Sequence, residues 1–255
     1  MVNRFSRRNL CETSLGFLAR GLVIARKDAK IYYFKPQIFG FGILIPAFVY
    51  LSFSVGREMP PSLLVPGLVG MVSLFGASSI EAISIPIEKQ AETYELLQIA
   101  PVSTQTIVFG KSLAGSAFGI VLSLGTALGA ILLTFSNVAN ISLFIIAAVI
   151  GAFAFSAFGM LVAAAANDMP TANMSLTALR LPMIFISGVF IPVQSLPLQL
   201  QIISYFSPLT YMVNALRDAM ISPSIMFAVN IAVLLAWLLV FQTLAVLVLN
   251  RKTKI

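Results

Sequence analysis

The chain has 255 residues, of which 59% are hydrophobic and only 10% are charged, and its mean hydropathy is +0.98. A soluble domain keeps about 25% charged residues to cover its surface, so this composition excludes a soluble globular protein and indicates an integral membrane protein. The net charge of +7 comes from basic residues grouped by topology, as shown below, and we expect no nucleic acid partner.

The first 36 residues contain eight of the 16 basic residues. Between Leu15 and Tyr32 apolar residues recur at steps of three and four, with basic residues on the other faces. This pattern predicts an amphipathic helix that lies along the cytoplasmic membrane surface and leads into the first span. A helix that only anchors the orientation is the alternative. Arg20, Arg26 and Lys27 interrupt any signal-peptide core, so we interpret residues 1–36 as an interfacial segment.

Long apolar runs fill the rest of the chain. A run of about 20 residues crosses about 30 Å of hydrocarbon as a helix, whereas a β-barrel needs short segments of alternating polarity. The sequence therefore predicts a single all-α transmembrane domain over residues 37–255. Its six spans are expected near 37–55, 63–87, 107–134, 141–166, 174–192 and 225–249.

The basic residues set the orientation. Of the 16, 13 lie in the N-terminal segment, around the connection 88–106 and in the C-terminal tail. Arg57 and Arg217 lie in the opposite loops, and Arg180 lies within the fifth span. The positive-inside rule then places both termini and the connection between the second and third spans in the cytoplasm.

Two ionisable residues fall inside apolar runs, Glu81 in the second span and Arg180 in the fifth. An unpaired charge at that depth is costly. We therefore hypothesise an ion pair between them, with independent snorkelling or the lining of a wet cavity as the alternative. Small residues at Gly115, Gly119, Gly125, Gly129, Gly151 and Gly159 predict close helix packing within the bundle, or a subunit interface.

A polar stretch at 87–103 separates the second and third spans. At 100° per residue Glu88, Glu92 and Glu95 fall within about 60° on one face of a helix that Pro101 ends. Grouped carboxylates suit basic residues of a partner, and the alternative is a plain solvated face. The candidate partner-binding residues are Glu88, Glu92, Tyr94, Glu95, Leu96, Leu97 and Pro101.

The sequence predicts no catalytic or metal site. It contains no histidine, which excludes Ser-His chemistry and His-based zinc sites, and no pair of acids lies within the predicted spans. Gln105–Ser112 ends like a phosphate-binding loop, but position 105 is Gln where that loop needs Gly.

Prolines interrupt the apolar stretch after residue 174, so a single helix cannot run through it. We predict that the fifth span ends near residue 191, and that two half-helices at about 196–206 and 208–220 dip back into the outer leaflet. Two helices lying flat on the outer surface are the alternative. The stretch is punctuated by Pro182, Pro192, Pro197 and Pro208.

These motifs resemble ABC-2 type transporter permeases over nearly the whole chain. The C-terminal signature of that family is matched by Gly188, Pro192, Pro197, Pro208 and Arg217, and its cytoplasmic loop by Thr93–Leu97 and Ala100–Ser103. Glu92 and Ser207 depart from the pattern, since the family often has Gly and Asn there.

The resemblance implies the membrane subunit of a prokaryotic ABC exporter in the plasma membrane. Two copies, as a homodimer rather than a heterodimer, would form the pore among membrane lipids. Two copies of a separate cytoplasmic ATPase would hold ATP and Mg, while this chain holds no cofactor and is not an enzyme. The 87–103 stretch would be the coupling helix.

The expected substrate is amphipathic (a drug, a lipid or a glycan-lipid), because few charges lie within the predicted spans. Its path would run along the first, second and fifth spans, although aromatic residues there are also ordinary lipid-facing or core residues. A scaffold without transport, or a secondary transporter, remains the alternative function. The aromatic candidates are Phe39, Phe41, Phe48, Tyr50, Phe185 and Phe190.

Overall fold

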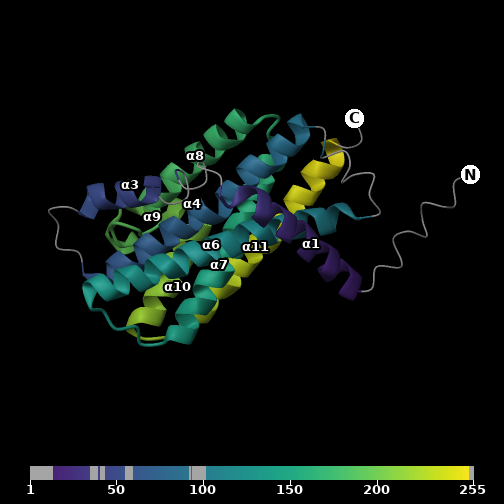
Figure 1. The fold of residues 1–255 in the computed structure, drawn as a ribbon. Helices are drawn as coiled ribbons and strands as arrows, with labels where there is room; N and C mark the ends of the chain where they lie inside the picture. Colours follow the sequence, from purple (N-terminus) through teal and green to yellow (C-terminus); the bar gives the residue numbers. More distant parts are fainter. Residues whose placement is uncertain are drawn as a thin grey trace, which may run out of the picture.

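The computed structural model describes residues 14–34, 40, 44–54, 60–91, 93 and 102–252. Over these residues the regular secondary structure is entirely helical, which confirms the predicted all-α class (Figure 1). Within this part of the chain, four helices are long and apolar enough to cross a membrane. They are α4 (Pro61–Gln90), α6 (Thr104–Thr134), α7 (Ile141–Ala165) and α11 (Ile225–Lys252).

The first and fifth predicted spans correspond to shorter helices. α3 (Ile45–Ser54) covers part of the first, and the rest of that prediction lies outside the described residues. α8 (Met169–Ile186) replaces the predicted 174–192. It begins early because the side chain of Asp168 accepts a hydrogen bond from the Thr171 amide at 2.8 Å. It ends before Gly188, whose φ of 79° suits glycine. The count of six spans stays a prediction.

α1 (Ser14–Tyr32) lies across the long helices, at the same end of the bundle as the C-terminal end of α11 (Figure 1). It packs on α6 where two glycines meet, since a Cβ on Gly110 would lie 2.8 Å from the Gly21 carbonyl oxygen. Its side chains Leu22 and Val23 are exposed. The helix forms as predicted, and its contact with a membrane surface stays a prediction.

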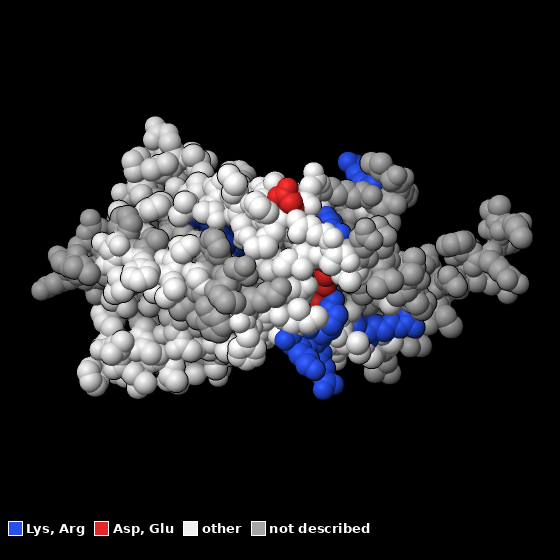
Figure 2. All heavy atoms as spheres, turned by 45° about the horizontal axis from the view of Figure 1, so that its top comes forward, with Lys and Arg blue, Asp and Glu red and all other residues white. Residues whose placement is uncertain are grey.

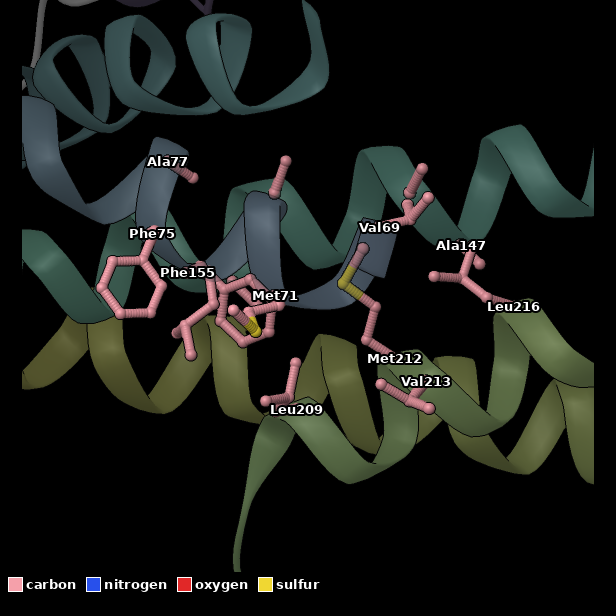
Figure 3. Packing of buried hydrophobic residues seen from close by; sticks show 14 of the residues in the cluster. Val69, Met71, Phe75, Ala77, Ala147, Phe155, Leu209, Met212, Val213 and Leu216 are labelled. Carbon is pink, nitrogen blue, oxygen red and sulfur yellow. The ribbon is translucent and has the colours of Figure 1, made fainter. Parts of the chain in front are cut away.

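α4 is the centre of the bundle, and every residue from Val69 to Pro86 is buried. Its apolar side chains pack against α7 and α10 (Pro208–Ile221), and Figure 3 shows Met71 and Phe75 of α4 near Phe155 of α7. A helix that is buried on every side, as α4 is here, is expected at the core of a bundle.

The predicted small-residue motifs divide into two groups. A Cβ on Gly119 would lie 2.5 Å from the Cβ of Ala77, and one on Gly159 would lie 2.6 Å from the Ser78 carbonyl oxygen. These glycines therefore let α6 and α7 approach α4 closely. Gly125 and Gly129, in contrast, face open space.

The segment after α8 folds into short helices, and a proline stands at the start of each. Pro192 precedes the 3-10 helix η3 (Val193–Ser195), Pro197 precedes α9 (Leu198–Ser204), and Pro208 is the first residue of α10. A proline suits the first turn because that turn needs no amide donor.

α10 runs alongside α7 instead of crossing its end. A Cβ on Gly151, ten residues into α7 and so about 15 Å from its start, would meet the sulfur of Met212. At its C-terminal end, Met220 and Ala219 carbonyls accept hydrogen bonds from the Ala139 and Asn140 amides at 3.1 and 3.0 Å. This geometry favours the dipping half-helix over the flat one, and its place in a bilayer stays a prediction.

Candidate functional site

Four charges, three of them buried, join three helices at one end of the bundle. Lys111 of α6 places Nζ 2.9 Å from Oδ2 of Asp28 and 2.8 Å from Oε2 of Glu88. Lys27 places Nζ 3.0 Å from Oδ1 of Asp28 and also pairs with Glu88. We call Lys27, Asp28, Glu88 and Lys111 the charge ring, because each cation contacts both anions.

The ring is electrically balanced and largely withdrawn from solvent. The side chains of Lys111 and Asp28 are 0% exposed and that of Glu88 is 5% exposed, whereas Lys27 is 38% exposed and closes the ring at the surface. Breaking a buried pair of this kind costs about 3–5 kcal/mol because it leaves an uncompensated charge. The ring therefore holds α1, α4 and α6 in a fixed relation.

Two members of the ring, Glu88 and Lys111, lie at the start of the predicted coupling segment 87–103 and shortly after its end. Glu88 lies in the last turn of α4, and Lys111 lies near the start of α6, where Ser103 caps the helix by accepting a hydrogen bond from the Thr106 amide at 3.3 Å. Lys89 donates to the Ala166 carbonyl at 3.2 Å and so ties the same end of α4 to the end of α7. The ends of α4 and α6 that flank the connection 91–103 are therefore tied to α1 and α7 as well as to each other.

This arrangement corrects the expectation for Glu88. Its carboxylate does not face a partner, because Lys27 and Lys111 draw it into the ring and leave the residue 4% exposed. Ile87–Gln90 form the end of α4, so any separate coupling helix begins later. The other candidates of the segment lie outside the described residues, and their roles stay predictions: Glu92, Tyr94, Glu95, Leu96, Leu97 and Pro101.

A tyrosine that follows α1 and a further carboxylate, on α4, lie close to the ring. The Tyr33 hydroxyl donates to the Ala114 carbonyl at 2.7 Å, and burial, followed by the charge of Glu81, raises the pKa of Tyr33 to about 12. Glu81 is fully buried and accepts from the Ser84 hydroxyl at 3.4 Å. Its carboxylate faces α6, since a Cβ on Gly115 would lie 2.9 Å from Oε1.

Arg180 of α8 is 1% exposed and is held by hydroxyl groups of α4. Its Nη2 donates to Ser78 Oγ at 2.6 Å and to Ser79 Oγ at 3.4 Å, and its Nε donates to Ser78 Oγ at 3.1 Å. The guanidinium carbon lies 4.9 Å from the centroid of the Phe75 ring, a cation–π contact.

The hypothesis of an ion pair between Glu81 and Arg180 is wrong. Glu81 of α4 faces α6, whereas Arg180 contacts Ser78 of α4 from α8. The ion pairs within the described ranges join the members of the charge ring and leave out Arg180. Helix periodicity predicts on which face of its helix each residue lies, but it does not predict which neighbouring helix packs against that face.

The predicted signature residues lie at the other end of the bundle. Arg217 of α10 donates from Nη2 to the Gly188 carbonyl at 3.0 Å, and the Ser187 and Ser207 hydroxyls share a hydrogen bond of 2.7 Å. These bonds fasten the turn after α8 to α10. A Cβ on Gly67 would lie 2.4 Å from the Val189 carbonyl oxygen, so α4 also contacts this turn.

Three of the aromatic candidates, Phe48, Phe185 and Phe190, lie within the described residues. Phe185 and Phe190 pack together with centroids 5.9 Å apart, Phe190 being buried and Phe185 45% exposed, while Phe48 of α3 is 65% exposed. Phe39 and Phe41, and the side chain of Tyr50, lie outside the described residues. Their role in a substrate path stays a prediction.

The sequence reasoning missed the charge ring because it counted Lys27 and Lys111 only as topology signals. Lys111 lies within the apolar run 107–134, so its position alone required a counter-charge. Asp28 stands among the basic residues of α1, and no other acid lies between Glu12 and Glu58. The buried position of Lys111 and the isolated acid Asp28 were therefore the sequence features that could have indicated the charge ring.

On the face shown in Figure 2, most of the basic side chains gather in the half of the described molecule that carries the ring, and the rest of the described surface of that face is largely uncharged. With long apolar helices that pack around α4, this distribution defines a multi-pass α-helical membrane protein. The profile of the ABC-2 type transporter family matches residues 17–221, so the chain belongs to that family.

Curated relatives agree with this assignment. The probable multidrug ABC transporter permease YbhR of Escherichia coli (strain K12) is 23% identical over 158 residues, which are 61% of this chain and 42% of that protein. ABC transporter G family member 20 of Dictyostelium discoideum is 31% identical over 198 residues, 75% of this chain and 27% of that protein. The chain therefore spans less than half the length of these relatives.

Proposed function

We propose that the chain is the membrane subunit of an ABC exporter that moves an amphipathic substrate outward, driven by a separate ATPase. The observation that carries this proposal is the charge ring. It fixes α1, α4 and α6 around the connection 91–103, at the end of the bundle where basic residues gather. A force applied to that connection would reach α4 and α6 as a unit.

In the proposed assembly, two copies of the chain pair in a prokaryotic plasma membrane, and two ATPase subunits bind from the cytoplasm. The ATPase holds ATP and Mg. Closure of the ATPase dimer moves the connection 91–103, which contains Glu92 and Glu95. α4 is the receiving element, because it is buried from Val69 to Pro86 and contacts α6, α7, α8 and α10. Family membership supports this scheme.

Charge reversal in the connection tests the proposal. We would express the chain together with a candidate ABC ATPase subunit and compare the wild type with Glu92→Arg plus Glu95→Arg, which leave the charge ring intact. The double variant is expected to lose ATPase co-purification and substrate efflux while keeping its expression and thermal stability. Lys30→Glu, an exposed change on α1, is the matched control.

Two outcomes would contradict the proposal. If the double variant kept both the ATPase and efflux, the connection would not be the docking element. If the wild type purified without any ATPase and transported without ATP, the secondary-transporter alternative would replace the exporter, and a chain without any transport would favour the scaffold.

A further inference from the structure

Among the residues that the structure describes, Arg180 has no anionic partner, although it lies where a charge needs one. It is 1% exposed, and its hydrogen bonds within the described residues go to the hydroxyls of Ser78 and Ser79. Nη1 donates no hydrogen bond within the same residues. A buried guanidinium with a free amino group can still accept an anion.

The two serines orient the guanidinium without neutralising it. Ser78 Oγ donates to the Leu74 carbonyl, and Ser79 Oγ donates to the Phe75 carbonyl at 2.6 Å. Because each hydroxyl proton is already committed to α4, the oxygens can only accept from Arg180. The cation is therefore held in place with its charge intact.

The charge lies deep in the bundle. Ser78 precedes Glu88 by ten residues on α4, which is about 15 Å along the helix. At this depth a positive charge is costly unless an opposite charge joins it. The charge ring shows how this chain solves that problem elsewhere, with two acids for two bases.

α8 is attached in a way that allows this site to open. It buries one stripe of residues at steps of four, namely Ala172, Leu176, Arg180 and Ile184. Pro182 lies inside the helix, two residues from Arg180, and removes a backbone hydrogen bond there. The turn beyond is fastened by the Arg217–Gly188 and Ser187–Ser207 bonds. The proline thus separates a fixed outer end from the part that carries Arg180.

We propose that Arg180 binds the anionic group of an amphipathic molecule, a carboxylate, sulfonate or phosphate, between α4 and α8. This inference rests on the proposed function in one respect, because it takes α4 and α8, the second and fifth predicted spans, to line the substrate path expected from the sequence. A guanidinium matches such groups by its planar fork of donors. The Phe75 ring, whose centroid lies 4.9 Å from the guanidinium carbon, offers apolar surface for the rest of the molecule.

A matched pair of probes tests the site. We would measure, by fluorescence, the binding of 11-(dansylamino)undecanoic acid and of its methyl ester to the full purified chain in a neutral detergent. The acid is expected to bind the wild type at least about tenfold more tightly than the ester, as a charge-assisted hydrogen bond predicts. Arg180→Gln should abolish this preference and Arg180→Lys should keep part of it.

The control is Lys30→Gln, which removes one exposed positive charge from α1 and should leave the preference unchanged. Displacement of the acid by phosphatidylglycerol in nanodiscs would identify a lipid headgroup as a natural ligand, and displacement by inorganic phosphate would identify a small anion. Either result supports the site. Equal binding of acid and ester by the wild type would overturn it, whether or not the Arg180 variants fold.

The binding assay uses the chain without an ATPase, so its outcome is independent of transport. Equal binding would remove the anion site and leave the exporter proposal standing. An acid preference in a chain that neither recruits an ATPase nor transports would keep the site and remove the export function.

Discussion

The charge ring and Arg180 are two buried charged regions along the same helix, and they are built differently. In the ring, two cations meet two anions from three helices. About 15 Å away along α4, Arg180 contacts hydroxyls and an aromatic ring, and no acid among the described residues pairs with it. The first arrangement holds helices together, whereas the second keeps a charge available. The difference suggests that stability and ligand binding are separated along α4.

The largest expected effect comes from opening the ring. Lys111→Met leaves Asp28 and Glu88 buried with only the partly exposed Lys27 beside them, and should lower the free energy of unfolding by about 3–5 kcal/mol. The measurement is an SDS titration in mixed micelles. Lys30→Met is the control, and an equal loss in both variants would show that the ring contributes no special stability.

Arg180→Met should change stability in the opposite direction. It removes a charge that lacks an ionic partner, so the free energy of unfolding should rise by about 1–2 kcal/mol once the lost cation–π contact is included. The same titration would detect it. A loss of similar size to that of Lys111→Met would mean that Arg180 is a structural residue, and the contrast between the two regions would fail.

Tyr33→Phe removes the hydrogen bond to Ala114 next to the ring and should cost about 1 kcal/mol at pH 7. The folded-state pKa of Tyr33 is raised to about 12, from 10.0. The stability that the protonated phenol contributes is therefore complete below pH 10 and is lost as the pH rises towards 12. Unfolding of both proteins at several pH values would show the gap closing, and a pH-independent gap would contradict this account.

Lys27→Met should have the smallest effect. Lys27 is 38% exposed, so solvent screens its pairs with Asp28 and Glu88, and we expect a loss of about 1 kcal/mol or less. Raising the ionic strength should lower the free energy of unfolding of the wild type towards that of Lys27→Met, because salt screens the exposed Lys27 pairs. The buried Lys111 pairs should be unaffected. A loss as large as that of Lys111→Met would show that the ring acts as one unit.

The sequence predicted most of the helical plan because its signals are local. Apolar runs located α4, α6, α7 and α11 to within a few residues, and Pro192, Pro197 and Pro208 marked the starts of the short helices. The start of α8 was missed because the capping role of Asp168 was overlooked.

The buried charges were harder to predict because their partners are distant in the chain. Lys111 and Asp28 are separated by 83 positions, and Arg180 and Ser78 by 102. Periodicity placed Glu88 on an acidic face, but not which neighbouring helix would cover that face. The position of Lys111 within an apolar run indicates that an acidic partner exists, but it does not identify Asp28 as that partner.

The two backbone bonds between α10 and the loop that precedes α7 bear on how the protein can be labelled. Short loops between spans are the usual sites for epitope tags and for topology mapping. Here the amides of Ala139 and Asn140 complete the otherwise open C-terminal end of α10. An insertion next to Ala139 and Asn140 would therefore displace α10, which packs against α4. A topology reporter placed in this loop would report on a protein with altered structure.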